Sequence, residues 1–286
     1  MRRKERGEAR MKTTQEPTIT MKDATKSQVG VLLALYSYRF LSPELLQVHL
    51  AIKSRTTIYD RLKLLMSRGW IDRRHEPRDK LLGKPAAYYL TRIGMAQLKK
   101  HYDLEASVMK TIYNNATVSK EFIERKLMIA AVANELCRLY AKTGDFYTSN
   151  DLMEFRSIPD YTPDGYIKMR AKHYFVDVLD PNTPEFVMLR KVRAYIQHDE
   201  SGEREEENGY PTILLICSSP RLQNYLHKKV RQLLYAHDAE FAVGVTTLEA
   251  LKAAEDKKDK IWRSVTVKKG VVALNMVEKD EEDDYE

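Results

Sequence analysis

The sequence has few of the features that mark membrane proteins, secreted proteins or disulfide-stabilised folds. Its 286 residues include two cysteines, Cys137 and Cys217, which show no metal-ligand spacing and are expected to be reduced thiols in the core. No apolar run approaches the roughly 18 residues that cross a bilayer, and the first residues lack the apolar segment of a secretion signal. We therefore expect a cytoplasmic protein with no membrane partner.

Several enzyme motifs are also missing. The sequence contains no GxxxxGK[ST] phosphate loop, no GxGxxG turn, no paired CxxC, and no HxH triplet such as a histidine-dependent nicking relaxase would use. These absences leave no standard nucleotide, redox or nicking site on which an enzymatic function could be argued.

What the sequence does have is an uneven division of charge. With 43% hydrophobic and 31% charged residues, it can form about two globular domains. Residues 1–150 carry 28 basic and 15 acidic side chains, whereas residues 151–286 carry 20 basic and 26 acidic ones. The basic half favours a polyanionic partner, because neutralising phosphates and releasing their counterions drives nucleic-acid binding.

Three short helices are predicted in the basic half, behind a flexible basic arm at residues 1–26. Apolar residues recur at helical spacing from Val29 to Phe40. Ser42 and Ser54 are N-cap residues that open a second and a third helix, and Gly69 provides a left-handed stop. This arrangement is typical of a helix-turn-helix.

A β-hairpin is predicted directly after the third helix. The segments Trp70–Arg74 and Ala86–Leu90 read as strands, with a polar turn around Pro77–Lys80. The run Tyr88–Gly94 looks like the strand-to-helix exit of winged-helix regulators, and this resemblance covers residues 27–101. We therefore predict a winged helix-turn-helix over residues 27–103, with the hairpin as its wing.

The third helix and the hairpin hold the candidate DNA-binding residues. In a helix-turn-helix the third helix enters the major groove, where its outward side chains contact base edges and phosphates. Bidentate contacts to guanine suit arginine, and threonine suits a thymine methyl group. The candidates are Lys53 just before the helix, Arg55, Thr56, Thr57, Tyr59, Arg61 and Lys63 on the helix, and Arg73, Arg74, Arg78, Lys80 and Lys84 on the wing. The alternative is a winged helix that binds protein instead of DNA.

The second half of the sequence alternates between strands and helices. Strands are expected near Tyr161–Met169, Tyr174–Leu179, Thr212–Cys217 and Phe241–Thr246, and helices near Thr183–His198 and Ser219–Leu234. We expect a helical linker at 104–118, a mixed α/β domain at 119–275 and an acidic tail at 276–286. The fold class is therefore α+β.

Two carboxylates in this half are candidates for a metal-dependent site. Asp164 and Asp177 fall on successive predicted strands, where two carboxylates can share a divalent metal for phosphodiester hydrolysis. The alternative is a purely structural role, in which Asp164 ends a turn and Asp177 pairs with a nearby Lys or Arg.

The pattern resembles the replication-relaxation family of mobile genetic elements, in which a winged helix is joined to a domain like that of the PD-(D/E)XK nucleases. The matching residues are Pro163-Asp164-Gly165, Tyr174–Asp180, Leu189, Lys191 and Tyr195, followed by Ile213–Cys217 and Ile261-Trp262. The resemblance implies a nuclease-like fold for the second domain. It also implies a catalytic set of Asp164, Asp177 and a lysine, with Mg²⁺ on the two carboxylates if the site is active.

The sequence departs from the nuclease pattern where the catalytic lysine should stand. Leu179 lies two positions after the second carboxylate, so Lys168 or Lys191 would have to take over the role. We therefore expect an inactive nuclease-like domain without a cofactor, retained for dimerisation or DNA support.

Our prediction is a sequence-specific double-stranded DNA-binding protein of a plasmid, conjugative element or phage, most simply a transcriptional regulator that works as a homodimer. Two alternatives are a relaxosome or replication accessory factor, which binds origin DNA and recruits another protein, and a metal-dependent nuclease.

Overall fold

The computed structural model describes residues 24–141, 145–155, 158–169, 172–180, 182–202, 210–265, 271–274 and 277. The chain divides into two compact units, an N-terminal one through Ala131 together with Met153–Phe155, and a C-terminal one formed by the remainder. This division falls inside helix α7, whereas the sequence prediction placed the boundary ahead of that helix. Residues 1–23 of the arm predicted at 1–26, the acidic segment at 203–209 and the acidic tail after Val277 lie outside the described residues, and the first helix already begins at Lys26.

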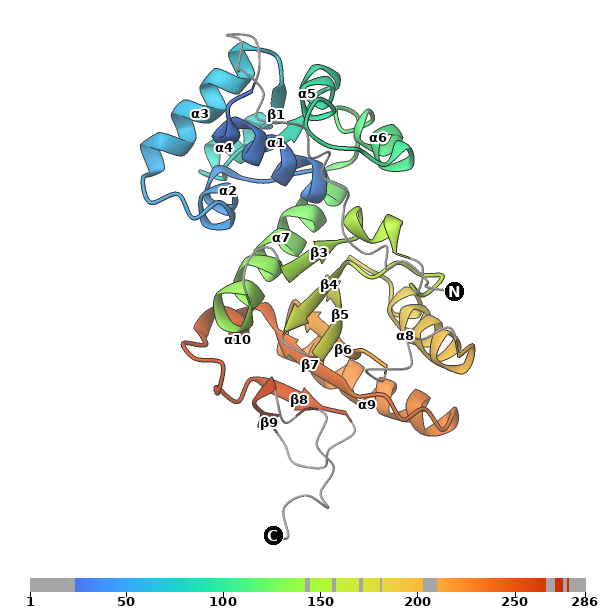
Figure 1. Cartoon of the computed structure of the whole chain (residues 1–286). Coiled ribbons are helices and arrows are strands. Elements are labelled where there is room, and N and C mark those ends of the chain that lie inside the picture. The colour runs from blue at the N-terminus through green and yellow to red at the C-terminus, as the bar shows by residue number, and fades with distance from the viewer. Residues whose placement is uncertain are drawn as a thin grey trace. The chain divides into compact units, whose positions relative to one another are not determined.

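The N-terminal unit begins with three helices, as predicted (Figure 1). They are α1 (Lys26–Tyr38), α2 (Pro43–His49) and α3 (Arg55–Ser67). The predicted caps are confirmed, because the side chains of Ser42 and Ser54 accept hydrogen bonds from the backbone N–H groups of Leu45 and Thr57. Gly69, with φ 67°, ends the third helix in the left-handed conformation that glycine adopts readily.

A two-stranded antiparallel hairpin follows these helices. Strand β1 (Ile71–Arg74) pairs with β2 (Ala87–Leu90), and the intervening residues form a short helix, α4 (Pro77–Leu81), where the sequence suggested only a polar turn. Pro77 at the first position starts this helix, since its fixed φ suits a helix N-terminus. Helices α5 (Arg92–Leu98), α6 (Ala106–Ile112) and α7 (Lys120–Tyr140) come next.

Gly94 is required by a close approach between α5 and the start of the hairpin. A Cβ at this position would lie 1.9 Å from the Trp70 carbonyl oxygen. In α1, by contrast, the nearest atom to a Cβ on Gly30 would be 3.7 Å away, at the Leu50 side chain. The backbone at Gly94 therefore leaves no room for a methyl group, whereas the backbone at Gly30 does.

We expect Gly94→Ala to lower the free energy of unfolding by about 1–3 kcal/mol, because the backbone of α5 must shift to relieve the clash. Gly30→Ala is the matched control and should be neutral or stabilising by up to about 1 kcal/mol, since alanine favours a helix interior. Urea denaturation of both variants measures the difference. Equal stability of the two variants would contradict the close approach.

The C-terminal unit is built on a mixed sheet in which seven described strands pair in sequence order. The strands are β3 (Phe146–Thr148), β4 (Gly165–Met169), β5 (Lys172–Leu179), β6 (Thr212–Cys217), β7 (Val243–Thr247), β8 (Trp262–Ser264) and β9 (Val271–Val272). The central pairs β5–β6 and β6–β7 are parallel and the others are antiparallel. A helix lies between the two strands of each parallel pair, which agrees with the predicted alternation of strands and helices.

Helices α8 (Glu185–Glu200) and α9 (Pro220–Ala236) cover one face of this sheet (Figure 1). Their apolar side chains pack on alternate residues of the parallel strands, including Phe175 and Leu215. Because Asp177 has the same strand parity as Phe175, it also points toward α8, into the apolar core. The fold thus places one carboxylate inside a hydrophobic layer.

The end of α7 belongs to the C-terminal unit. Arg138 donates hydrogen bonds to the carbonyls of Leu251, in α10 (Leu248–Ala253), and of Ala254, while Tyr140 accepts one from the Trp262 indole. Cys137 and Cys217 are free, and burial raises the pKa of each thiol to about 12. Within the described residues, no helix has the length and apolarity needed to span a bilayer.

Candidate functional site

The exposed face of α3 carries four of the twelve predicted DNA-binding residues. Ile58, Leu62 and Leu65 are buried against the rest of the unit, which leaves the opposite side of the helix in solvent. The exposed candidates are Arg55, Thr56, Tyr59 and Lys63, with Lys53 exposed just before the helix. Thr57 and Arg61 are half-buried at the flank of this face.

Arg55 is held in a small polar network that reaches the preceding helix. Its guanidinium lies 3.4 Å from a carboxylate oxygen of Glu44 in α2 and 3.4 Å from the Tyr59 hydroxyl, and it also sits over the Tyr59 ring at 5.5 Å. The hydrogen bond to Tyr59 and the Glu44 charge raise the pKa of Arg55. The arginine is thus positioned by neighbouring side chains while staying exposed to solvent.

The basic residues of the hairpin are used in different ways. Arg73, Arg78 and Lys80 are exposed on β1 and α4. Arg74 is half-buried and donates hydrogen bonds to the carbonyls of Ala116 and Val118. Its contacts are therefore internal to the unit.

Lys84 is exposed and forms long ion pairs, at 3.8 Å to Asp79 and 3.7 Å to Glu124. Asp79 is also bound by Lys120 at 2.9 Å, and this hydrogen bond lowers the pKa of Asp79. Sequence reasoning missed Glu44 and Lys120, because neither lies in a recognisable motif and both act across helix boundaries.

The structure brings together the three predicted residues of the C-terminal unit. Lys191 Nζ, on α8, lies 2.6 Å from Asp177 Oδ1 on β5 and 3.2 Å from Asp164 Oδ2, just before β4. The Val178 N–H donates a further hydrogen bond to Asp164 Oδ2. All three side chains are buried, with Asp177 at 0% exposure and Lys191 at 2%.

Two tyrosines complete this buried cluster. Tyr195, one turn after Lys191 on α8, donates a hydrogen bond of 2.7 Å to Asp177 Oδ2, and Lys191 Nζ lies 4.6 Å from the centre of the Tyr161 ring. Burial raises the pKa of Asp177 and the Asp164 charge adds to the rise, whereas the Lys191 charge and the hydrogen bonds from Lys191 and Tyr195 oppose it. Sequence analysis noted Tyr195 only as part of a family pattern, so its contact with Asp177 is new.

Of the two lysines considered as replacements at Leu179, Lys191 is the one beside the carboxylates. Leu179 is buried in the core, and Lys168 is exposed. The residues in this arrangement do not fit Mg²⁺, because the Lys191 ammonium occupies the position between the two carboxylates and Mg²⁺ needs six oxygen ligands, several of them water. Among the described residues no group of three His, Cys, Asp or Glu side chains could hold a metal ion.

No protein-family model matches the chain, and no curated protein gives a significant match to its sequence.

Proposed function

We propose that the N-terminal unit is a winged helix-turn-helix and that the chain is a sequence-specific double-stranded DNA-binding protein, acting as a transcriptional regulator of a plasmid, conjugative element or phage. The observation that carries this proposal is the exposed face of α3, on which Arg55, Tyr59 and Lys63 follow one another at four-residue spacing. Such a face places three donors along a helix that fits the major groove.

The hairpin supports the same proposal. It follows α3 directly, as the wing does in a winged helix, and it presents Arg73, Arg78 and Lys80 to solvent. Exposed basic side chains of this kind contact phosphates and set the orientation of the protein on the duplex. Arg74 and Lys84 contribute less in this proposal, because both have partners within the unit.

The C-terminal unit is proposed to act as a dimerisation or recruitment domain with a nuclease-like core that has lost its activity. The carboxylates and Lys191 then serve as a buried ion-pair cluster that fixes α8 on the sheet. A two-fold dimer would bind a repeated or palindromic site, with half-sites spaced by the distance between the two α3 helices.

A gel shift with DNA from around the protein's own gene tests the proposal. The binding is done in magnesium buffer, and the same samples are run on a denaturing gel to reveal strand breaks. We expect a discrete shift that resists competitor DNA, with intact strands. A binding site at a promoter supports the regulator, whereas a site at a replication or transfer origin supports the accessory factor.

Two results would overturn parts of this proposal. The absence of any competitor-resistant shift rules out sequence-specific binding to the DNA tested. Strand cleavage that needs magnesium and disappears in Asp177→Ala would establish a nuclease and overturn the proposal that the nuclease-like core is inactive.

A further inference from the structure

Helix α9 is a basic element within an acidic half of the sequence. Its 17 residues include four basic side chains and no acidic one, although residues 151–286 as a whole carry more acidic than basic residues. The apolar stripe of α9 faces the core through Leu226, Val230 and Leu234. Its other side is exposed, so the basic charge is directed at solvent.

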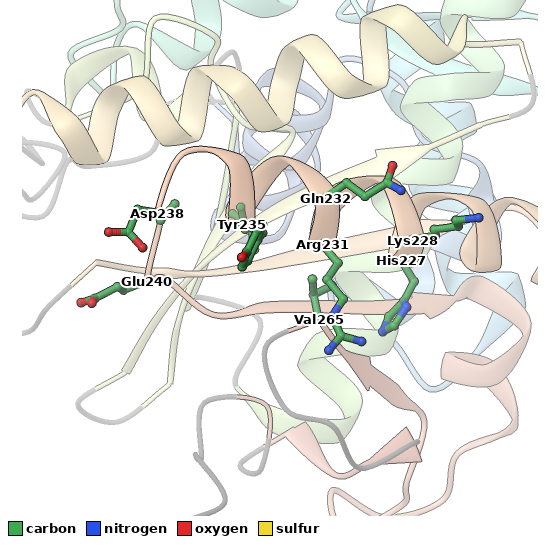
Figure 2. Close-up of a pocket in the computed structure, with 10 residues that line it drawn as sticks. His227, Lys228, Arg231, Gln232, Tyr235, Asp238, Glu240 and Val265 are labelled. Atoms are coloured by element: carbon green, nitrogen blue, oxygen red, sulfur yellow. The ribbon is translucent and has the colours of Figure 1, made fainter.

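A hollow of about 590 Å³ lies along this exposed side (Figure 2). Lys228, Arg231 and Tyr235 line it at positions i, i+3 and i+7, which lie on one face of a helix. No ion pair between described residues involves Lys228 or Arg231. Tyr235 is 91% exposed, so its ring contributes little to the packing of the unit.

A histidine of α9 and one further arginine lie close to the end of the hollow that holds Lys228 and Arg231. His227 Nε2 donates a hydrogen bond of 2.9 Å to the Ser264 carbonyl, and Arg263 on β8 contacts Asn224 of α9. Burial lowers the pKa of His227, and the charges of Arg263 and Arg231 lower it further. The lowered pKa favours the neutral form of His227, so the positive charge at this end comes from Lys228 and Arg231 on α9 and from Arg263 on β8.

The other end of the hollow is acidic. Asp238 and Glu240 follow the helix, and Figure 2 shows Tyr235 between them and the basic side chains. Their charge disfavours phosphates beyond Tyr235 and confines a polyanion to the side of Lys228 and Arg231. An exposed aromatic ring one helical turn from an arginine matches an unpaired nucleobase joined to its phosphate.

We propose that this surface of α9 binds single-stranded nucleic acid, with Arg231 and Lys228 at phosphates and Tyr235 stacked on a base. Stacking on Tyr235 requires a base that is not paired, which distinguishes this surface from one that holds a duplex by its phosphates alone. The inference does not depend on α3 reading duplex DNA, because it concerns the other unit.

Fluorescence anisotropy of the full chain with a fluorescein-labelled 20-nucleotide oligo-dT tests this site. Tyr235→Ala is expected to weaken binding about tenfold and Tyr235→Phe to retain it, because phenylalanine keeps the stacking ring. Phe186→Ala is the matched control, since Phe186 is a 70% exposed aromatic residue on α8, and it should leave the affinity unchanged.

The salt dependence of the same binding tests the phosphate contact. Arg231→Ala should reduce the slope of log K against log salt by about 0.7, the value for one phosphate of a single strand. Arg193→Ala removes an equal charge from an exposed position of α8 and should not change the slope.

The proposal is overturned if Tyr235→Ala and Arg231→Ala behave like their controls. It is also overturned if polyglutamate displaces the oligonucleotide at equal charge concentration, because the surface would then bind acidic protein segments. Failure of the duplex gel shift leaves these results unaffected, so the two proposals are tested separately.

Discussion

Lys191→Met is expected to lower the free energy of unfolding of the C-terminal unit by about 3–5 kcal/mol, because it leaves two buried carboxylates without their cation. Lys191 Nζ lies within 3.2 Å of both Asp164 and Asp177 and is the only described lysine hydrogen-bonded to them. Urea denaturation in a Trp70→Phe background measures the effect, because the fluorescence of Trp262 then reports on the C-terminal unit alone.

The pH dependence of this loss has a definite sign. Burial already raises the pKa of Asp177, and removing the ammonium raises it further. A carboxyl whose pKa is higher in the folded state than in the unfolded chain binds its proton on folding, so stability is retained at low pH and lost as the pH rises through the folded pKa. Lys191→Met should therefore cost less at pH 4 than at pH 7.

A second substitution separates charge from packing. Asp177→Asn combined with Lys191→Met removes one carboxylate charge together with the cation, and we expect it to recover part of the lost stability at pH 7. Arg193→Ala, on the exposed side of the same helix, should change stability by no more than about 0.5 kcal/mol. If Lys191→Met costs no more than Arg193→Ala, the cluster does not stabilise the fold.

The sequence predicts the elements of this protein better than the contacts between them. The caps at Ser42 and Ser54 and the strands β5 to β7 follow from local pattern, because each is set by neighbouring residues or by unbroken apolar runs. The parallel pairing of these strands was not predicted. Helix α4 and strand β3 were missed, since both are short and lack a strong period. Their existence depends on tertiary partners.

For the candidate sites too, the sequence predicts individual residues better than the contacts between them. Asp164 and Asp177 are candidates because they fall on successive predicted strands, and Lys191 is a candidate only through the resemblance to the nuclease pattern. Their mutual distances follow from the crossover that lays α8 on the sheet. The hydrogen bond from Tyr195 and the pairing of Arg55 with Glu44 join residues 18 and 11 positions apart on different elements. The sequence predicts α9 only as a helix and does not single out its basic face. The exposure of that face and the hollow beside it are visible only in the structure.

Arg55→Ala is expected to weaken binding to the cognate duplex by about tenfold, the loss of one bidentate base contact, while binding to scrambled DNA changes much less. Arg61→Ala should act in the same direction with a smaller effect, because Arg61 is half-buried at the flank of α3. Quantitative gel shifts on cognate and scrambled duplexes measure, for each variant, the ratio of the two affinities. The salt concentration is kept fixed, because salt alone changes affinity strongly.

The matched control for this prediction is Arg92→Ala, which removes the same charge from an exposed position of α5, where Arg92 sits over the Tyr113 ring at 5.0 Å. It should weaken binding to both duplexes equally and only slightly. Glu44→Gln should change the affinity in the opposite direction. It releases Arg55 from its acidic neighbour and should therefore strengthen binding to both duplexes. Equal losses on cognate and scrambled DNA in Arg55→Ala would assign Arg55 to a phosphate and place sequence reading elsewhere on α3.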